Sequence, residues 1–432
     1  MTGSEMAEND TTEYVVAVVP AISEIGRNDW DRCLEVSLTT ADARGASTND
    51  GKSSEPGPIH VKEADANAGV IHPVNPFVTY DFLNALETTG CISASTGWFP
   101  QHLVLRGKGD DALAVMPAYL KSHSMGEYVF DHGWAQAFEA AGGDYYPKLQ
   151  CAVPFTPVTG PRVLVRPGVD QVTAIKAMAS ATAQLTDRIG ASSAHVTFLN
   201  QDQWQVFGAA GFLKRTDRQF HWHNADYVSF DDFLAVLTSR KRKDIRKERA
   251  RALAGDIEIE WLTGDQIKPH HWDSFYQFYL DTGMRKWGEP YLNHEAFTAF
   301  GEKMADHILL VMAKQQDRYI AGALNFIGAD TLYGRYWGCL ETHDFLHFEV
   351  CYYQAMEYAI KAGLKTVEAG AQGEHKLMRG YMPETTYSAH YIRHPGLAHA
   401  IEAYLDEERR HGALEREVLA DHGPFRKGPT KT

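Results

Sequence analysis

Cysteine pairs and long apolar runs are both missing from this sequence of 432 residues. Its five cysteines are scattered and none belongs to a Cys-x-x-Cys motif, which excludes a disulfide framework and gives no structural-zinc signature. The longest apolar runs, "YVVAVVPAI" and "HILLVMA", are far shorter than the about 18 residues that span a bilayer. Residues 1–13 are acidic and lack the apolar segment of a signal peptide. We therefore expect a cytoplasmic protein with no membrane span and no metal site.

An excess of positive charge is missing as well. The formal net charge is −14 at pH 7, which argues against binding along DNA, because that requires a basic surface. The sequence also contains no GxxxxGK[ST], GxSxG or HExxH motif and no strand-linked GxGxxG, so several common hydrolase and nucleotide-binding classes lose their usual support. What is present is 44% hydrophobic residues, which indicates a folded globular protein.

Two stretches of the chain show a similar order of expected elements. The first contains strands such as "HLVLRG" and "AHVTFLN" and a helix, "TAIKAMASATAQLTDRIG", that ends at Gly190. The second contains the strand "IEIEWLTG", a three-strand meander from "HILLVMA" to "YGRYWG", and the helix "LHFEVCYYQAMEYAI". The pattern predicts an α/β (α+β) fold made of two duplicated domains, with mixed central sheets flanked by helices.

Composition sets the expected boundaries. The stretch from 40 to 72 is rich in Gly, Ser, Asp and Asn and has almost no apolar periodicity, which predicts a flexible insertion. Order resumes at a helix for which Asn75 or Thr79 is the candidate N-cap. We expect a disordered tail at 1–13, an N-terminal domain at 14–212, a C-terminal domain at 213–395, and a C-terminal helix and tail at 396–432.

The strongest charge feature is the basic stretch "SRKRKDIRKERAR". Residues 240 to 251 hold eight Lys or Arg against two acidic residues, with only a thin apolar stripe at helical spacing. Such a run is either a solvated helical face with i,i+4 pairs or an anion-binding surface. Because like charges so close together repel one another, the sequence favours a polyphosphate-bearing ligand. The residues expected to bind it are Arg242, Lys243, Arg246 and Lys247.

The block "VEAGAQGEHKLMRGY", residues 367–381, places ionisable residues directly after glycines. Glycine lets the backbone approach a ligand closely and exposes amide donors, while a cluster of acid, base and cation is typical of proton transfer or anion binding. A surface loop with this composition is the alternative. We expect a loop that crosses a cleft between the halves, with Glu374 and His375 as candidate bases and Gly370, Gly373 and Arg379 as binding residues. Either the backbone amides of the glycine-rich loop or Lys376 would hold an oxyanion.

The helix after "YGRYWG" is the expected opposite wall of that cleft. Asp344 is its candidate N-cap, and His347 and Glu349 fall in its first turns. A carboxylate on an apolar helical face requires a raised pKa or a dedicated partner, so Glu349 is a reserve catalytic base. His343 and His347 have the spacing of a metal pair, but no third ligand is evident. Arg335 and Tyr336 are expected on the strand beneath, as binding residues.

Several long blocks resemble those of one protein family. Together they are similar to the FemAB-like peptidoglycan biosynthesis/recognition family, a branch of the acyltransferases with the GNAT (GCN5-related N-acetyltransferase) fold, over about residues 75 to 400. The resemblance implies two tandem GNAT-like domains, with the helix at 346–362 where that fold receives pyrophosphate. The usual [RQ]xxGx[GA] loop before that helix is absent here, which argues against acetyl-CoA. The matching blocks are "HSMGEYVFDHGWAQAF", "YYPKLQCAVPFTPVTGPR", "SRKRKDIRKERAR", "YGRYWG", "LHFEVCYYQAMEYAI" and "EAGAQGEHKLMRGYMPETTYSAHYI".

The residues and the resemblance together lead to one expected reaction class. We expect an acyl or aminoacyl transferase that joins an activated carboxyl group to an amine, which is a cell-wall precursor if the family description holds. No tightly bound cofactor is expected. An acyl-CoA or an aminoacyl-tRNA is the candidate co-substrate, so tRNA is a possible contact. The alternative is a non-catalytic module that binds a peptidoglycan precursor or another phosphate-bearing ligand.

Overall fold

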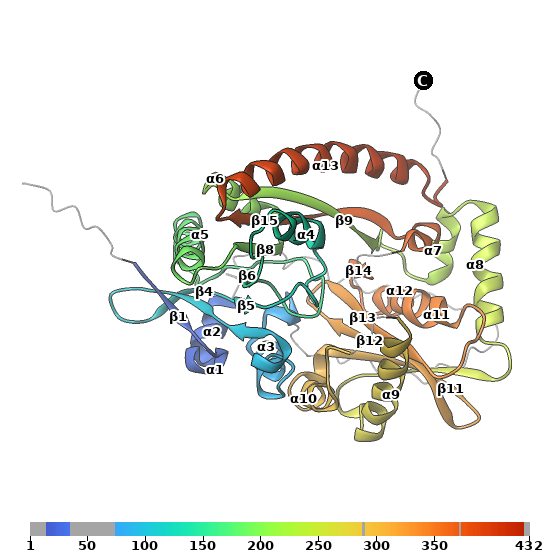
Figure 1. The fold of residues 1–432 in the computed structure, drawn as a ribbon. Coiled ribbons are helices and arrows are strands. Elements are labelled where there is room, and N and C mark those ends of the chain that lie inside the picture. The colour runs from blue at the N-terminus through green and yellow to red at the C-terminus, as the bar shows by residue number, and fades with distance from the viewer. Residues whose placement is uncertain (1–13, 35–73, 287–289, 371–372, 427–432) are drawn as a thin grey trace, which may run out of the picture.

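The fold is known from a computed structural model that describes residues 14–34, 74–286, 290–370 and 373–426 (Figure 1). The predicted tail at 1–13 and the whole of the predicted insertion at 40–72 lie outside these ranges. None of the helices in these ranges is both long enough and apolar enough to cross a membrane.

The first half contains short strands and helices that alternate along the chain. Its helices are α1 (Ile22–Ile25), α2 (Arg27–Leu34), α3 (Tyr80–Thr88), α4 (His132–Ala140), α5 (Gln171–Arg188) and α6 (Gln201–Ala209). Its strands are β1 (Val15–Val19), β2 (Trp98–Pro100), β3 (His102–Arg106), β4 (Ala112–Met116), β5 (Tyr119–Lys121), β6 (Lys148–Cys151), β7 (Leu164–Val165) and β8 (Ser193–Leu199).

The second half begins with a long strand and ends with the longest helix in Figure 1. Its strands are β9 (Leu213–His223), β10 (Ile257–Leu262), β11 (Ile308–Gln315), β12 (Arg318–Ile327), β13 (Thr331–Cys339), β14 (Thr366–Glu368) and β15 (Met382–Ile392). Its helices are α7 (Phe230–Val236), α8 (Ser239–Ala252), α9 (Pro269–Lys286), α10 (His294–Met304), α11 (Leu346–Phe348), α12 (Gln354–Lys361) and α13 (Pro395–Asp421).

Each half contains the same crossover. In the first, β6 is followed by β7 of the other sheet, by α5 and then by β8, which pairs with β6 in parallel. In the second, β13 is followed by α11, a π-helical turn (Glu349–Tyr353) and α12, and then by β14, which pairs with β13 in parallel. Antiparallel strands precede the crossover in both halves. The α/β fold with two tandem GNAT-like halves is therefore confirmed.

The largest sheet does not stop at the boundary between the halves. Eleven strands pair in the order β10-β11-β12-β13-β14-β9-β15-β8-β6-β5-β2, and a separate sheet has the order β1-β3-β4-β7. The predicted boundary between residues 212 and 213 falls at the start of β9. Strand β15, late in the chain, pairs with β9 of the second half on one side and with β8 of the first half on the other. The two halves therefore share one continuous sheet, which the expectation of separate domains did not include.

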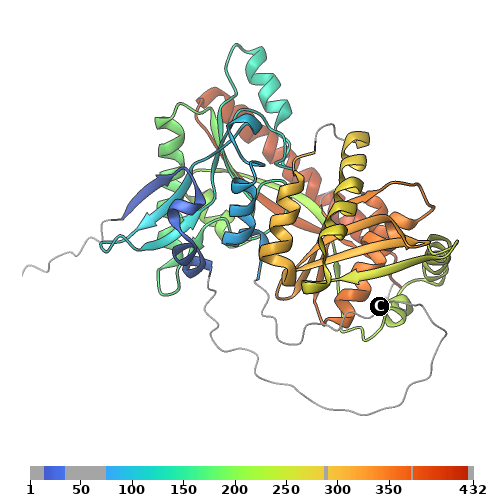
Figure 2. The same ribbon diagram turned by 90° about the horizontal axis from the view of Figure 1, so that it is seen from below.

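Besides the shared sheet, a cluster of aromatic side chains on α3, α10 and β12 joins the two halves. Figure 2 shows α3 and α10 side by side in the middle of the molecule. The ring of Phe82 on α3 stacks on that of Phe300 on α10, with centroids 5.2 Å apart, and Phe77 contacts Phe326 of β12. These side chains are fully buried, so the interface resembles a domain core rather than a mobile contact.

Helix ends show where the local signals held. Of the two candidate caps for α3, Thr79 is confirmed, whereas Asn75 caps the preceding 3₁₀ turn, Pro76–Val78. The prediction for Asp344 is wrong, because Phe345 precedes α11 and the Asp344 carboxylate pairs with Arg251 instead. Arg251 competes for the carboxylate, and no backbone amide of α11 donates a hydrogen bond to it.

Candidate functional site

A cavity of about 500 Å³ lies where the crossovers of the two halves meet. The first half contributes the loop between β5 and α4 and the segment after β6, and the second contributes α9, β13, α11 and the loop after β14. Its volume is in the range of small-molecule sites. The lining residues are Ser124, Met125, Gly126, Tyr128, Phe130, His132, Phe155, Pro157, Tyr279, Thr282, Gly283, Pro290, Tyr291, Gly334, Arg335, Tyr336, Trp337, His347, Ala369, Gly370 and Lys376.

A β-bulge in β13 forms the floor of the cavity. Tyr336 pairs with Leu324 and Gly334 pairs with Asn325, so Arg335 is the extra residue. Successive residues of a regular strand point to opposite faces, but a bulge re-aims them, and Arg335 and Tyr336 both line the cavity. The parallel pairing with β14 spans only Thr331–Tyr333, so the two strands separate where the cavity begins.

Lys376 reaches the cavity through the glycine-rich loop. Gly370 and Gly373 have φ values of 77° and 108°, which side-chain-bearing residues rarely adopt, and the chain then forms a 3₁₀ turn at Glu374–Arg379. The Lys376 Nζ donates hydrogen bonds to the carbonyl oxygens of Ala369 (2.6 Å) and Gly370 (3.0 Å). An ammonium has three N–H groups, so these two bonds leave one for a ligand.

The charge of Lys376 has little local compensation. Its side chain is only 4% exposed, and burial, reinforced by the Arg335 guanidinium, lowers its pKa to about 8. At neutral pH Lys376 is thus mostly an ammonium, and it is held by carbonyl oxygens without a carboxylate in hydrogen-bond contact among the described residues. A buried cation in this state binds an oxygen that acquires negative charge.

Arg335 adds a second donor to the cavity floor. Its Nη2 donates to Glu368 Oε1 at 2.9 Å, and both side chains are almost fully buried. Its Nε is buried and has no hydrogen-bond partner among the described residues, and the same holds for Thr282 Oγ1, also on the cavity wall. Buried polar atoms without partners are rare in native proteins, so these two atoms indicate where a ligand oxygen would bind.

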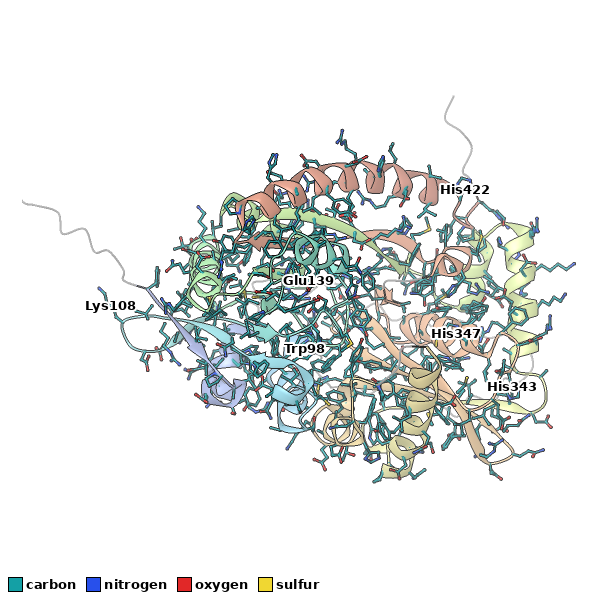
Figure 3. All side chains as sticks on the ribbon, viewed as in Figure 1. Trp98, Lys108, Glu139, His343, His347 and His422 are labelled. Atoms are coloured by element: carbon teal, nitrogen blue, oxygen red, sulfur yellow. The ribbon has the colours of Figure 1, made fainter. Side chains whose placement is uncertain are left out.

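His347 lies on the cavity wall at the start of α11. Its ring contacts Trp337, with centroids 5.1 Å apart, and Tyr352 at 5.3 Å. Figure 3 shows His343 nearer the outer edge of the molecule, and it bonds Glu341 there. No group of three or more potential metal ligands occurs in the ranges that the structure describes.

His375 and Arg379 do not line the cavity. His375 is exposed, and a hydrogen bond of 2.9 Å joins its Nε2 to the Tyr352 hydroxyl. The Arg379 guanidinium stacks 3.4 Å above the Phe348 ring and donates to both oxygens of Glu248. The side chain of Glu374 lies outside the described part of the structure.

Glu349, the reserve base of the sequence analysis, is not on the cavity wall. It is fully buried, and Arg249 of α8 binds both of its oxygens, with Nη2 2.8 Å from Oε1 and Nε 3.0 Å from Oε2. Gln354 donates a further bond to Oε1. Arg249 is thus the dedicated partner that a carboxylate on an apolar helical face requires. Glu349 and Arg249 form a structural ion pair.

Helix α8 carries the basic stretch along the edge of the second half (Figure 1). Arg249, Arg246 and Arg251 form ion pairs with Glu349, Asp231 and Asp344. The other cations predicted to bind phosphates, Arg242, Lys243 and Lys247, do not line the large cavity. Instead, a smaller hollow of about 200 Å³ lies against α8, and its lining residues are Lys241, Asp244, Ile245, Lys247, Glu248, Arg251, Phe345, Met378 and Arg379.

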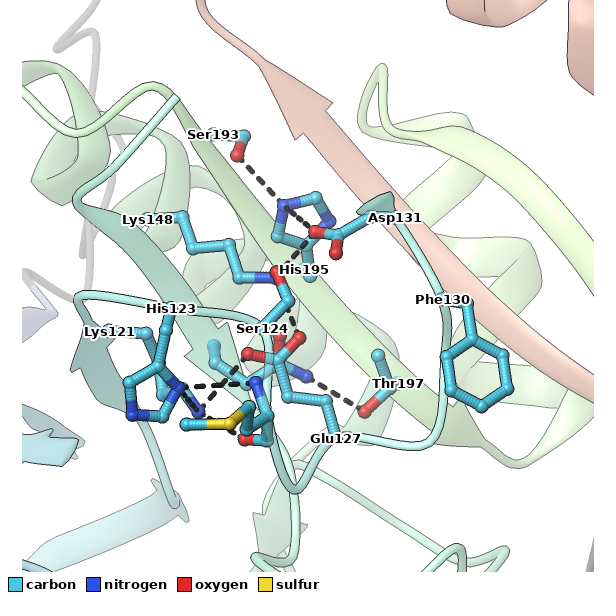
Figure 4. Close-up of polar contacts among 12 residues, drawn as sticks. Lys121, His123, Ser124, Glu127, Phe130, Asp131, Lys148, Ser193, His195 and Thr197 are labelled. Carbon is cyan, nitrogen blue, oxygen red and sulfur yellow. Dashed lines mark hydrogen bonds and ion pairs between the residues drawn. The ribbon is translucent and has the colours of Figure 1, made fainter. Parts of the chain in front are cut away.

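A buried cluster of charges supports the cavity wall that the first half contributes (Figure 4). Lys148 of β6 donates to Ser124 Oγ (2.7 Å), Glu127 Oε2 (2.6 Å) and Asp131 Oδ2. Burial alone lowers the pKa of a lysine, but the charges of Glu127 and Asp131 outweigh it and raise the pKa of Lys148. Lys148 therefore fixes the loop 122–131, five of whose members line the cavity.

The cluster extends to two histidines and a second lysine. His195 and His390 face each other with Nδ1 atoms 2.7 Å apart, and burial lowers the pKa of both, to about 3 for His195. Lys121 lies 3.3 Å from Glu127 and 3.4 Å from the centroid of the Trp98 ring, and burial lowers its pKa to about 7. These groups come from four strands and one loop, and local patterns in the sequence could not have brought them together.

Comparison with known proteins places these features in a family. The comparison with curated protein sequences finds no match. Solved structures that are similar include FemX (14% identity, 77% of this chain and 96% of that one covered, TM-score 0.48) and a tandem GNAT protein from the clavulanic acid biosynthesis pathway (11% identity, 89% and 99% covered, TM-score 0.42). Another is the C-terminal domain of a putative lysylphosphatidylglycerol synthetase from Agrobacterium fabrum (9% identity, 69% and 87% covered, TM-score 0.44).

The family comparison covers most of the chain. The FemAB-like family model, described as peptidoglycan biosynthesis/recognition, matches residues 58–427. The match includes both crossovers, the cavity and α8. The chain belongs to the FemAB-like peptidoglycan biosynthesis/recognition family.

Proposed function

We propose that this protein is an acyl or aminoacyl transferase that passes an activated carboxyl group to an amine. The observation that carries the proposal is the Lys376 ammonium, which is buried on the wall of a ligand-sized cavity with one N–H available. The unpartnered Arg335 Nε on the same wall supports it, because both groups stabilise an oxygen that gains negative charge. Membership of the FemAB-like family also supports it.

The reaction uses these groups in one addition and one elimination. The amine nitrogen attacks the carbonyl carbon of the activated group, a C–N bond forms, and the carbonyl oxygen becomes an oxyanion beside Lys376. His347, on the wall of the same half, accepts the proton that the amine loses. The carrier oxygen or sulfur then leaves with its electron pair and takes up a proton, which restores the imidazole.

The carrier is an acyl-CoA or an aminoacyl-tRNA, both of which carry phosphates. The hollow beside α8 provides Lys241, Lys247 and Arg251 for them. Phe345 lines that hollow and His347, two residues later, lines the cavity, so the start of α11 separates the two sites. A donor with phosphates on α8 would therefore pass this turn to place its acyl group near Lys376.

The decisive experiment measures product. Purified protein is incubated with acyl-CoAs or aminoacyl-tRNAs and candidate amines, including peptidoglycan precursors, and amide products are detected by mass spectrometry. We expect a product with the wild type and with the matched control Lys365→Met, whose side chain is exposed, and about 100-fold less with Lys376→Met. Binding of a precursor without any product would instead favour a recognition module.

A further inference from the structure

Glu368 is a buried carboxylate at the end of β14, next to the cavity but not on its wall. It is 2% exposed, and its backbone lies between Tyr333 of β13 on one side and His221 of β9 on the other. The next two residues, Ala369 and Gly370, line the cavity. Because a strand paired on both sides is among the least mobile parts of a fold, the carboxylate has a fixed place beside the site.

The group that Glu368 binds is the guanidinium of Arg335. Nη2 of Arg335 donates to Glu368 Oε1 at 2.9 Å, and Nη1 donates to the carbonyl oxygen of Gly334, also at 2.9 Å. The rings of Phe77 and Tyr333 lie 5.0 and 5.3 Å from its central carbon. A guanidinium is planar and its N–H groups have fixed directions, so these contacts also determine where Nε points.

A comparison with the pair of Arg249 and Glu349 shows what is unusual here. Glu349 accepts hydrogen bonds from both Nε and Nη2 of Arg249, the bidentate arrangement of a structural ion pair. The Glu368 carboxylate accepts from Nη2 of Arg335, and Nε of Arg335 has no partner among the described residues. The second pair therefore keeps one N–H of a cavity-lining arginine available to a ligand.

The charge of Glu368 also acts on Lys376. Burial lowers the pKa of Lys376 to about 8, and among the neighbouring described groups Arg335 lowers this pKa further, while Cys351 and Glu368 raise it. These three groups lie on β13, in the π-helical turn and on β14. Arg335 and Lys376 repel each other, so a carboxylate on Arg335 reduces the cost of holding both cations at one cavity.

Two further groups are under the influence of Glu368. Burial lowers the pKa of Arg162 to about 9 and lowers that of His221, and the charge of Glu368 opposes both shifts. Neither Arg162 nor His221 lines the cavity, whereas Arg335 and Lys376 both do. The action of Glu368 on a ligand in the cavity is therefore expected through the latter two cations.

We propose that Glu368 is a positioning residue: its carboxylate fixes the Arg335 guanidinium with Nε available to the substrate oxygen, and it offsets the positive charge that Arg335 adds beside Lys376. This inference rests on the proposed function and deepens it, because it names the group that lets two neighbouring cations serve one oxyanion. Glu368 acts through Arg335 and does not touch the substrate.

Chemical labelling of Lys376 tests the effect on charge without any transfer reaction. Acetic anhydride reacts with the neutral amine alone, so the pH dependence of acetylation of the full chain, followed by peptide mass spectrometry, gives the pKa of Lys376. We expect a midpoint near pH 8 in the wild type and about one pH unit lower in Glu368→Gln, because loss of the negative charge disfavours the ammonium. Glu368→Asp keeps the charge and should stay close to the wild-type midpoint.

The labelling experiment has two controls. The exposed Lys268, acetylated in the same samples, should show the same midpoint in every variant. Glu258→Gln removes an exposed carboxylate from strand β10 and should leave the midpoint of Lys376 unchanged.

Turnover tests the positioning of Arg335. Glu368→Asp shortens the side chain by one methylene and withdraws the carboxylate from Nη2, so kcat should fall roughly 10-fold to 100-fold. KM for the donor should change less than about twofold, since the oxyanion forms only after binding. The alkaline decline of kcat should stay near pH 8 in Glu368→Asp and move down with the labelling midpoint in Glu368→Gln. A merely structural role would leave the pH profile in place.

A double variant keeps the test valid if Glu368→Gln fails to fold, because that single change leaves the Arg335 charge buried without its carboxylate. Arg335→Gln/Glu368→Gln removes both charges. The labelling midpoint of Lys376 should then lie above the wild-type value, because Arg335 has the larger influence of the two. A midpoint that is the same in the wild type and in either of these variants would overturn the inference.

The outcomes also separate this inference from the proposed function. Product from the wild type, together with unchanged midpoints and unchanged kcat in the Glu368 variants, would remove the inference and leave the transferase proposal intact. Midpoints that shift as expected, without product from any donor, would remove the transferase proposal and leave the link between Glu368, Arg335 and Lys376 intact.

Discussion

Two buried lysines, one in each half, show how the same side chain serves different purposes. Lys148 is fully buried and bonds Glu127, Asp131 and Ser124, and its pKa is raised. Lys376 is almost as buried but bonds only carbonyl oxygens in the described structure, and its pKa is lowered to about 8. The first lysine is part of a neutralised cluster that shapes a wall, while the second retains binding capacity toward a cavity.

The difference lies in the backbone as much as in the charges. Lys148 is on a regular strand between paired neighbours, and its partners come from a loop folded over it. Lys376 follows a loop whose glycines have positive φ, so its position is set by backbone that only glycine adopts readily. Two buried lysines that look equivalent by exposure are thus distinguished by whether a carboxylate faces them.

Removing the charge of Lys148 should have the largest effect on stability. Lys148→Met leaves the carboxylates of Glu127 and Asp131 buried without their main partner, so we expect the free energy of unfolding to fall by about 3 to 5 kcal/mol. Denaturant-induced unfolding measures it, with Lys365→Met as the control. An unchanged midpoint would show that the cluster does not hold the loop and would remove one side of the comparison.

The same substitution at Lys376 should act on turnover. Lys376→Met leaves no carboxylate unpaired, so the free energy of unfolding should change by about 1 kcal/mol or less, while kcat falls about 100-fold to 1000-fold. Both are measured on one preparation. If Lys376→Met lowered the free energy of unfolding by as much as is expected for Lys148→Met, together with kcat, then Lys376 would have a structural role like that of Lys148.

The pH dependence of activity should report the lowered pKa of Lys376. The oxyanion is held by the ammonium form, so kcat should decline as pH rises through about 8, where Lys376 loses its proton. The same group also affects stability. The pKa of Lys376 is about 8 in the folded chain and near the ordinary 10.5 in the unfolded chain, so between these pH values the unfolded chain binds more protons. The free energy of unfolding therefore decreases as the pH falls from about 10.5 to about 8. Rate profiles of wild type and Lys376→Arg check it, and an alkaline decline at the same pH in Lys376→Arg would assign it to another group.

The smallest expected effect is at α8. Replacing the exposed Lys243 and Lys247 with Gln should leave unfolding unchanged but make donor binding less dependent on salt, by about 0.7 in the logarithmic slope for each lost phosphate contact. Donor binding is titrated at several salt concentrations, with Lys365→Gln as control. An unaltered slope would return α8 to the role of a solvated face whose arginines form ion pairs.

Much of the fold could be predicted from local sequence signals. Caps such as Asn75 and Thr79 and the crossover helices follow from side-chain preferences that act over a few residues. Five residues of the predicted constellation also line one cavity: Arg335, Tyr336, His347, Gly370 and Lys376. Their approach to one another was predictable because strand, helix and glycine loop follow in an order typical of a crossover.

The rest depends on contacts between distant segments. Glu349 is bound by Arg249, one hundred residues earlier, and no local rule pairs them. The Lys148 cluster joins strands and a loop between residues 121 and 390, and the bulge at Arg335 is set by pairing with β12. The sequence of the basic stretch also could not show that Arg249 pairs with a buried carboxylate, because each cation in the stretch has similar neighbours in sequence.

The central strand β15 has a consequence for how the chain is made. Residues 382–390 pair with β9 on one side and residues 387–392 pair with β8 on the other, so this edge of β8 is covered only by a segment near the end of the chain. During synthesis from the N-terminus, the first half would therefore carry an open sheet edge until residue 392 has left the ribosome. We expect fragments that end before β15 to aggregate, and the complete chain to acquire resistance to proteolysis in a single step.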